Sequence, residues 1–272
     1  MTTATLTRSS TTHPTGRVSP SAGLRHGLTI TWRNLMRIKR SPESLLDLTL
    51  QPIIFIVLFV YLFGGAVAGS QHAYLQYLLP GLLVQTVVFA SAGTGVGLAD
   101  DITKGIFDRF RSMPIARSAP LVGTIMGDFV RYVVSIAIVF AYGSLLGFRI
   151  GANPLWALGG VLLMMAVGFG LSWIWVLLGL FVKSPQSVQG LGFVLMFPLT
   201  FGSNVFVQTD TLPGWLQAWV KVNPVSALTN AMRDLVEGHG PLATPIWHSL
   251  AWAAALCVVF APLAVRRYRQ IA

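Results

Sequence analysis

The sequence predicts an all-α polytopic membrane protein with six transmembrane helices. Two observations support this prediction: long stretches without charge, and an uneven distribution of Lys and Arg. Between Asp47 and Asp100 lie 52 residues with no Asp, Glu, Lys or Arg. An ordinary soluble domain has about a quarter charged residues, and a helix needs about 20 apolar residues to cross a ~30 Å hydrocarbon core. The stretch therefore predicts two crossings joined by a connection of about ten residues.

Further uncharged stretches predict four more crossings. They run over residues 132–148, 150–182, 184–209 and 238–265. The first has only 17 residues, about 25 Å of helix, so this helix must include the preceding turn, which holds Asp128 and Arg131. The six expected helices cover residues 48–68, 78–99, 122–147, 155–182, 187–207 and 247–265.

The distribution of Lys and Arg orients these helices in the membrane. Residues 1–47 carry seven of them, residues 100–118 carry four, Lys183 adds one, and the segment after residue 265 adds three. The opposite side would carry Arg149, Lys221 and Arg233. Because cytoplasmic flanks are enriched in Lys and Arg, both termini are expected in the cytoplasm. The net charge of +10 then reflects this bias and attraction to anionic lipid, and no nucleic-acid partner is expected.

The residues before the first crossing divide into a tail and a helix. Residues 1–22 are rich in Thr, Ser and Pro and predict a disordered cytoplasmic tail, without the apolar run of a cleavable signal peptide. Residues 23–41 predict an amphipathic helix at the membrane interface, whose basic face holds Arg33, Arg37 and Arg40. This helix either anchors the chain on lipid or also touches a cytoplasmic partner. Ser41 as cap and Pro42 then begin the first crossing.

The loop 100–118, between the second and third crossings, predicts a short amphipathic cytoplasmic helix. Ile106, Phe107 and Phe110 provide an apolar face with charged residues around it, Gly105 permits a bend, and Pro114 ends any helix before it. The charged residues are Asp101, Lys104, Asp108, Arg109 and Arg111. Such a helix fits a partner's groove, and aromatic residues and Arg often dominate protein contacts. The alternative is a solvated loop that only satisfies the charge bias.

Two further polar groups stand out in or near the predicted membrane region. Asp128 and Arg131 are three residues apart and can pair on one helix face, as a membrane-boundary pair or as a contact to a neighbouring helix or a cytoplasmic gate. The connection 208–246 contains an aromatic-rich short helix, and a second helix beginning at Asn223 and Pro224. Trp residues at membrane boundaries anchor at headgroup level, so this connection is expected at the outer interface. There Arg233 and Asp234 are expected to be exposed and inert, or to close the outer mouth of a pathway.

Residues for catalysis and cofactor binding are sparse. The five His residues lack metal-ligand spacing, Cys257 is the only cysteine, and no phosphate-binding G-x-x-x-x-G-K-[ST] occurs. No catalytic, metal or cofactor residue is therefore proposed, and an intramembrane enzyme is disfavoured. Work on a substrate would need energy from a partner or an ion gradient.

Three blocks of sequence resemble the ABC-2 type permease subunits of ATP-binding cassette exporters. They are Gln51-Pro52 with residues 59–64, residues 100–117 with 127–131 and 147–149, and residues 223–226 with 231–233. The likeness is greatest to the daunorubicin/doxorubicin-resistance permeases of actinobacteria, and it covers about residues 25–270. It implies a bacterial plasma membrane protein in which residues 42–270 form an ABC-2 type transmembrane domain.

The resemblance also implies partners. The loop 100–118 would be a coupling helix that docks onto a separate ATPase subunit, which binds ATP and Mg. The coupling contacts would come from Asp101, Gly105, Asp108, Arg109, Phe110, Arg111 and Pro114. Residues 23–41 would be a connecting helix beside the same partner, and a second permease copy, identical or paralogous, would complete the pathway.

The implied function is ATP-driven export of amphipathic lipophilic small molecules. Aromatic and Met side chains could form an adaptable apolar substrate surface, or could simply face lipid and other helices. They are Phe89, Met196, Phe197, Phe201 and Phe206. Alternatives are export of a lipid or lipid-linked glycan, and a non-transporting membrane anchor or sensor for a cytoplasmic partner.

Overall fold

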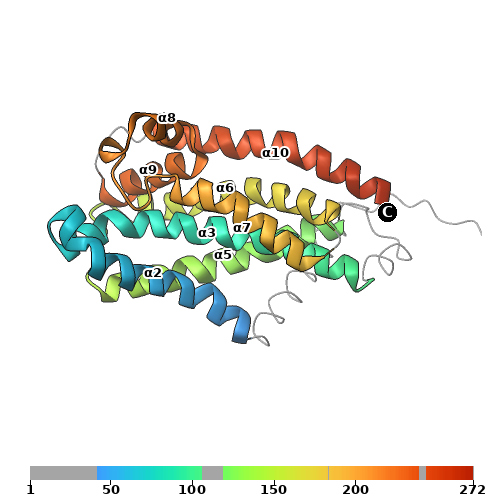
Figure 1. Cartoon of the computed structure of the whole chain (residues 1–272), viewed down its shortest axis with the longest axis horizontal. Coiled ribbons are helices and arrows are strands. Elements are labelled where there is room, and N and C mark those ends of the chain that lie inside the picture. Colours follow the sequence, from blue (N-terminus) through green and yellow to red (C-terminus); the bar gives the residue numbers. More distant parts are fainter. Residues whose placement is uncertain (1–41, 106–118, 183, 239–242, 272) are drawn as a thin grey trace, which may run out of the picture.

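The computed structural model describes residues 42–105, 119–182, 184–238 and 243–271, and in these ranges the chain contains helices and no strand. The predicted all-α class is confirmed. Long helices run up and down in one bundle, and three short helices gather at one end of it (Figure 1). The long ones are α2 (Pro42–Ala68), α3 (Gln71–Thr103), α5 (Ala119–Leu145), α6 (Pro154–Phe181), α7 (Pro185–Phe201) and α10 (Ala243–Ile271). The short ones are η1 (Thr209–Thr211), α8 (Gly214–Val222) and α9 (Pro224–Glu237).

Five of the long helices are long and apolar enough to cross a membrane, so the chain is a multi-pass membrane protein. The candidate spans are Leu50–Ala68, Gln71–Thr103, Gly127–Leu145, Pro154–Phe181 and Thr244–Tyr268. The remaining long helix, α7, has 17 residues, which gives about 25 Å against a core of ~30 Å. It ends at Phe201 rather than at the expected residue 207, and buried residues follow it without helix. A sixth crossing by α7 therefore stays a prediction.

The connection between α2 and α3 is much shorter than expected. Only Gly69 and Ser70 separate the two helices. Gly69 has a φ of +72°, a conformation that glycine adopts without steric cost. The Ser70 hydroxyl then accepts a hydrogen bond from the Ala73 amide at 3.1 Å, which caps α3. The expected start at residue 78 was wrong, because about ten residues were allowed for the connection and the cap at Ser70 starts the helix at Gln71.

Other helices begin by a common local rule. A polar residue accepts a hydrogen bond from a backbone amide of the first turn, and Pro occupies the first helical position, where its missing N–H is not needed. The pairs are Asn153-Pro154 in α6, Ser184-Pro185 in α7 and Asn223-Pro224 in α9. The start of α9 agrees with the sequence prediction.

Helix α3 is the centre of the bundle and contacts α2, α5, α6, α7 and α9. Small residues let it approach α6 closely, as is common in membranes. A Cβ atom on Gly95 would lie 2.5 Å from the carbonyl oxygen of Trp175. The indole nitrogen of Trp175 donates a hydrogen bond to the Ser91 hydroxyl at 3.0 Å. A movement of α3 would therefore change its contacts with five other helices.

The helix directions agree with the charge distribution predicted for the two membrane sides. The ends of α3 and α10 lie at one end of the bundle (Figure 1). This end carries Lys104, Arg266 and Arg267. The opposite end holds the α5–α6 connection with Arg149, and α8 with Lys221. Which end faces the cytoplasm stays a prediction from the charge bias.

Candidate functional site

The expected coupling segment begins inside a helix rather than in a loop. Asp100 and Asp101 belong to the last turns of α3, which ends at Thr103, and the ammonium of Lys104 pairs with Asp100 at 2.6 Å. At 33 residues, α3 is about 50 Å long, so it can extend beyond a ~30 Å hydrocarbon core. Gly105 then turns the chain with a φ of +66°.

The remaining predicted partner contacts lie outside the described residues. These are Asp108, Arg109, Phe110, Arg111 and Pro114 of the coupling segment, and Arg33, Arg37 and Arg40 of the connecting helix. Residues 1–22 also lie outside, as does Lys183. Their roles stay predictions.

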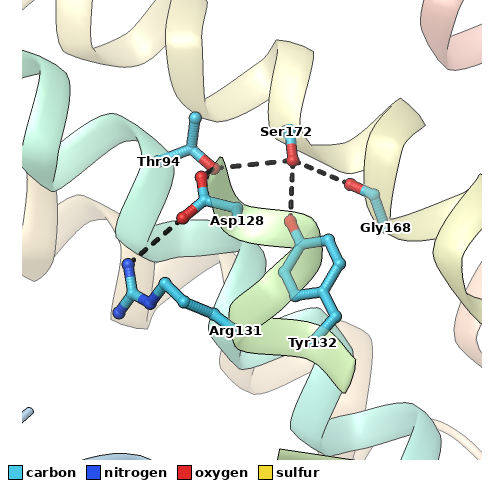
Figure 2. A network of polar contacts seen from close by, with 6 residues as sticks. All are labelled: Thr94, Asp128, Arg131, Tyr132, Gly168 and Ser172. Atoms are coloured by element: carbon cyan, nitrogen blue, oxygen red, sulfur yellow. Dashed lines mark hydrogen bonds and ion pairs between the residues drawn. The ribbon is translucent and has the colours of Figure 1, made fainter. Parts of the chain in front are cut away.

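The predicted pair Asp128 and Arg131 lies at the centre of a polar network between α3 and α5 (Figure 2). The Arg131 guanidinium donates to one carboxylate oxygen of Asp128 at 3.3 Å. The Thr94 hydroxyl of α3 donates to the other oxygen at 2.5 Å. Only 7% of the Asp128 side chain is exposed, against 27% for Arg131. The network therefore combines the pairing and the neighbouring-helix contact that the sequence left as alternatives.

The same network extends to α6. The Ser172 hydroxyl lies 2.8 Å from the Tyr132 hydroxyl and donates to the Gly168 carbonyl at 2.9 Å. Thr94 also reaches Ser172 at 3.5 Å. Figure 2 shows the side chains of three helices converging on one point. Sequence reasoning missed Thr94, Tyr132 and Ser172 because single hydroxyl groups are common in membrane helices.

A glycine makes room for the Arg131 guanidinium. A Cβ atom on Gly93 would lie 2.6 Å from one terminal nitrogen of Arg131 and 3.0 Å from the other. The guanidinium thus fits against the α3 backbone beside Thr94. A buried charge is tolerated only when it is paired and hydrogen-bonded, and here both carboxylate oxygens of Asp128 have partners.

At the opposite end of the bundle, Arg233 is buried, so the expectation that it is exposed was wrong. Only 9% of this residue is exposed. Its guanidinium donates to the backbone carbonyls of Tyr77 at 3.1 Å, Asn204 at 2.9 Å and Val205 at 3.2 Å. It also lies 3.7 Å from the centre of the Tyr77 ring, a cation–π contact.

The Arg233 contacts explain its burial. Desolvation lowers the pKa of the Arg233 guanidinium from its usual value, while Tyr77 acts in the opposite direction. An arginine starts from so high a pKa that it stays charged in proteins. The charge is therefore stabilised by carbonyl oxygens and an aromatic face, and Arg233 joins α9 to α3 and to the segment after α7. The alternative expectation, that Arg233 closes the outer mouth of a pathway, stays a prediction.

An aromatic row joins α2, α7 and the segment after α7. Phe197 and Phe201 stack with ring centres 4.6 Å apart, and Phe201 and Phe206 stack at 5.1 Å. Phe206 stacks in turn on Phe59 of α2 at 4.5 Å. Exposure falls along the row, from 51% at Phe197 to 6% at Phe206. The row therefore leads from the outside of the bundle into its core.

The predicted substrate side chains are only partly brought together. Phe197, Phe201 and Phe206 share the aromatic row, whereas Met196 is buried and Phe89 is a half-buried residue of α3. Sequence reasoning missed Phe59, which is the α2 member of the row. It also missed Phe55 of α2, which contacts Phe201. The recurrence of Phe55, Phe59 and Phe63 at intervals of four could have indicated a shared helix face.

Comparison with known proteins identifies the family to which the sequence is similar. The sequence profile of the ABC-2 type transporter family matches residues 26–236. The chain is 44% identical to a daunorubicin resistance ABC transporter permease protein of Streptomyces coeruleorubidus, over 89% of this chain and 86% of the relative. It is 31% identical to a doxorubicin resistance ABC transporter permease protein of Mycobacterium tuberculosis, over 77% of each. A putative transport permease of Cyanophora paradoxa is 26% identical, over 75% of this chain and 71% of the relative.

Proposed function

Because this chain belongs to the ABC-2 type transporter family, we propose that it is the membrane-spanning permease subunit of an ATP-driven exporter. The observation that carries the proposal is the family match over most of a multi-pass helical bundle. The absence of a phosphate-binding loop in the sequence fits a division of labour in which a separate subunit binds and hydrolyses ATP. The chain itself would catalyse no reaction.

The proposed partner contact follows the C-terminal end of α3. Helix α3 is long enough to leave the hydrocarbon core, and the mixed-charge segment after it would dock onto the ATPase subunit. Closure of two ATPase subunits on ATP would shift this segment in each permease copy. Only a partner that binds the two permease conformations with different affinity can drive such a change.

The proposed substrate is an amphipathic, lipophilic small molecule. Two relatives are named for resistance to daunorubicin or doxorubicin. The aromatic row of Phe197, Phe201, Phe206 and Phe59 offers flat apolar faces on which the rings of an aromatic substrate would stack. The row begins on an exposed face of α7, which a second permease copy or lipid would cover. The path would then run between two copies in a bacterial plasma membrane, with both termini cytoplasmic and α7 as the sixth crossing.

Reconstitution tests this function. The chain and the ATPase subunit that purifies with it would be placed in lipid vesicles, and ATP-dependent movement of daunorubicin would be measured. The matched control is an ATPase subunit whose phosphate-loop Lys is replaced. ATP-dependent movement that is lost in this control supports the proposal. Movement of a fluorescent phospholipid but not of daunorubicin would favour lipid export, and no movement of either would favour an anchor or sensor.

A further inference from the structure

The cluster of Thr94, Asp128 and Arg131 lies at matched distances from the C-terminal end of α3 and the N-terminal end of α5, the two helix ends nearest the proposed coupling segment. Thr94 precedes Lys104 by ten residues, and Asp128 follows the first residue of α5, Ala119, by nine. At 1.5 Å per residue, these intervals correspond to about 15 and 14 Å of helix. The cluster therefore joins α3 and α5 at a similar distance from these two helix ends.

The chemistry of this cluster opposes sliding of one helix along the other. Helix α3 supplies the Thr94 hydroxyl and the space at Gly93, and α5 supplies the ion pair. Hydrogen bonds to charged groups are stronger than neutral ones, and they are strengthened further where water is excluded. Separation of the helices at this point would leave the buried Asp128 carboxylate short of partners.

We propose that Thr94, Asp128 and Arg131 clasp α3 to α5, so that a displacement of the coupling segment moves both helices as one unit. These residues are positioning residues for transport, and they need not touch either ATP or the substrate. The inference rests on the proposed function. Without the clasp, the ATPase partner would displace the ends of α3 and α5 separately, and ATP hydrolysis would continue with little transport.

The central place of α3 in the bundle lets the clasp pass a displacement on to other helices. Helix α3 contacts α2, α6, α7 and α9 as well as α5. A movement that enters through a clasped α3–α5 pair therefore reaches the helices that carry the aromatic row. The link from Tyr132 to Ser172 extends the clasp to α6 through uncharged groups.

Two pairs of mild substitutions test the clasp without removing a buried charge. Thr94→Val deletes the hydroxyl that donates to Asp128, and Thr94→Ser keeps it. Gly93→Ala places a methyl group where the Arg131 guanidinium lies, and this flexible side-chain end can move aside without unfolding the chain. Gly97→Ala is the matched control one turn later, because no atom lies within 4 Å of the added methyl.

Transport and hydrolysis are measured together in vesicles that contain the chain and its ATPase subunit, with daunorubicin as the probe. For Thr94→Val and Gly93→Ala, we expect the amount transported per ATP hydrolysed to fall about tenfold, a typical size for coupling between sites. Hydrolysis and subunit association should stay near wild type. Thr94→Ser and Gly97→Ala should leave the ratio unchanged. An unchanged ratio in Thr94→Val and Gly93→Ala, or a parallel loss of both activities, would overturn the clasp.

Hydrogen exchange of the purified chain alone gives a second readout that does not need the partner. Thr94→Val and Gly93→Ala should speed exchange in residues 124–131 of α5, and their controls should not. Unchanged exchange in all four variants would refute the clasp even if transport is impaired. If the wild-type chain retains no ATPase subunit, the proposed function fails, while the exchange result still decides whether α3 and α5 are clasped.

Discussion

Replacement of Arg233 by Met is a quantitative test of how α9 is held against α3 and the segment after α7. The substitution keeps an unbranched side chain of similar length but removes the charge and the hydrogen bonds to three backbone carbonyls. The Asn204 carbonyl retains the Tyr77 hydroxyl as a donor at 2.9 Å. The Val205 carbonyl loses its Arg233 donor, and the Tyr77 ring loses its cation–π contact.

The expected destabilisation follows from these losses. An unsatisfied buried carbonyl costs about 1–3 kcal/mol, and a desolvated cation–π contact contributes about 2 kcal/mol. Relief from burying the charge offsets part of this sum, so we expect a loss of about 3 kcal/mol in the free energy of unfolding. For a chain of this size, this loss corresponds to a fall of about 6–12 °C in Tm.

Thermal unfolding in one detergent at one scan rate measures this effect, because unfolding of a membrane protein is commonly irreversible and depends on rate. Arg149→Met is the matched control, since Arg149 is exposed and its replacement should change Tm by less than about 2 °C. Arg233→Lys keeps the charge without the planar fork and should fall between the two. A Tm for Arg233→Met equal to that of Arg149→Met would refute the stabilising role of the Arg233 contacts.

Three further predictions address the partner surface, the core and the helix packing. Arg111→Glu should lower recovery of the ATPase subunit about tenfold without affecting membrane insertion. Arg149→Glu, on the side predicted to face away from the cytoplasm, should leave recovery of the ATPase subunit unchanged. Equal recovery with both variants would contradict the coupling assignment. Gln85→Leu should raise Tm by about 3 °C, since neither amide atom of buried Gln85 has a partner among the described residues. An unchanged or lower Tm would contradict this expectation. Gly179→Ala should lower Tm by about 5 °C, because its Cβ would lie 2.7 Å from a carbonyl oxygen of α3, whereas Gly190→Ala meets no atom within 4 Å; equal Tm values would argue against close packing.

Helix type and order could be predicted from the sequence because hydrophobic length and charge bias are properties of continuous segments. The uncharged stretch after Asp47 does contain two helices, as expected. Their ends were harder to predict, since Ser70 caps α3 through a local hydrogen bond that overrides the polarity of the first turn. The Asp128–Arg131 pair could be predicted because both residues lie on one helix, at a spacing that is visible in the sequence. The contact of Asp128 with Thr94 could not, because it depends on how α3 packs against α5.

Contacts between distant segments decide the rest of the candidate site. The burial of Arg233 was missed because the carbonyl groups that accept its hydrogen bonds belong to distant segments of the chain. The acceptors come from Tyr77 and from residues 204–205, which approach only when the bundle forms. The same limit hid Thr94, which pairs with Asp128 across 34 residues of chain. Such contacts depend on helix packing and cannot be read from periodicity.

Affinity purification tests most directly whether this chain works with a separate ATPase. The chain would be isolated from gently solubilised native membranes, and the proteins that accompany it would be identified by mass spectrometry. We expect a stoichiometric soluble subunit that carries G-x-x-x-x-G-K-[ST]. A reproducible complex without an ATPase, under conditions that keep known membrane complexes intact, would contradict the exporter account and favour an anchor or sensor.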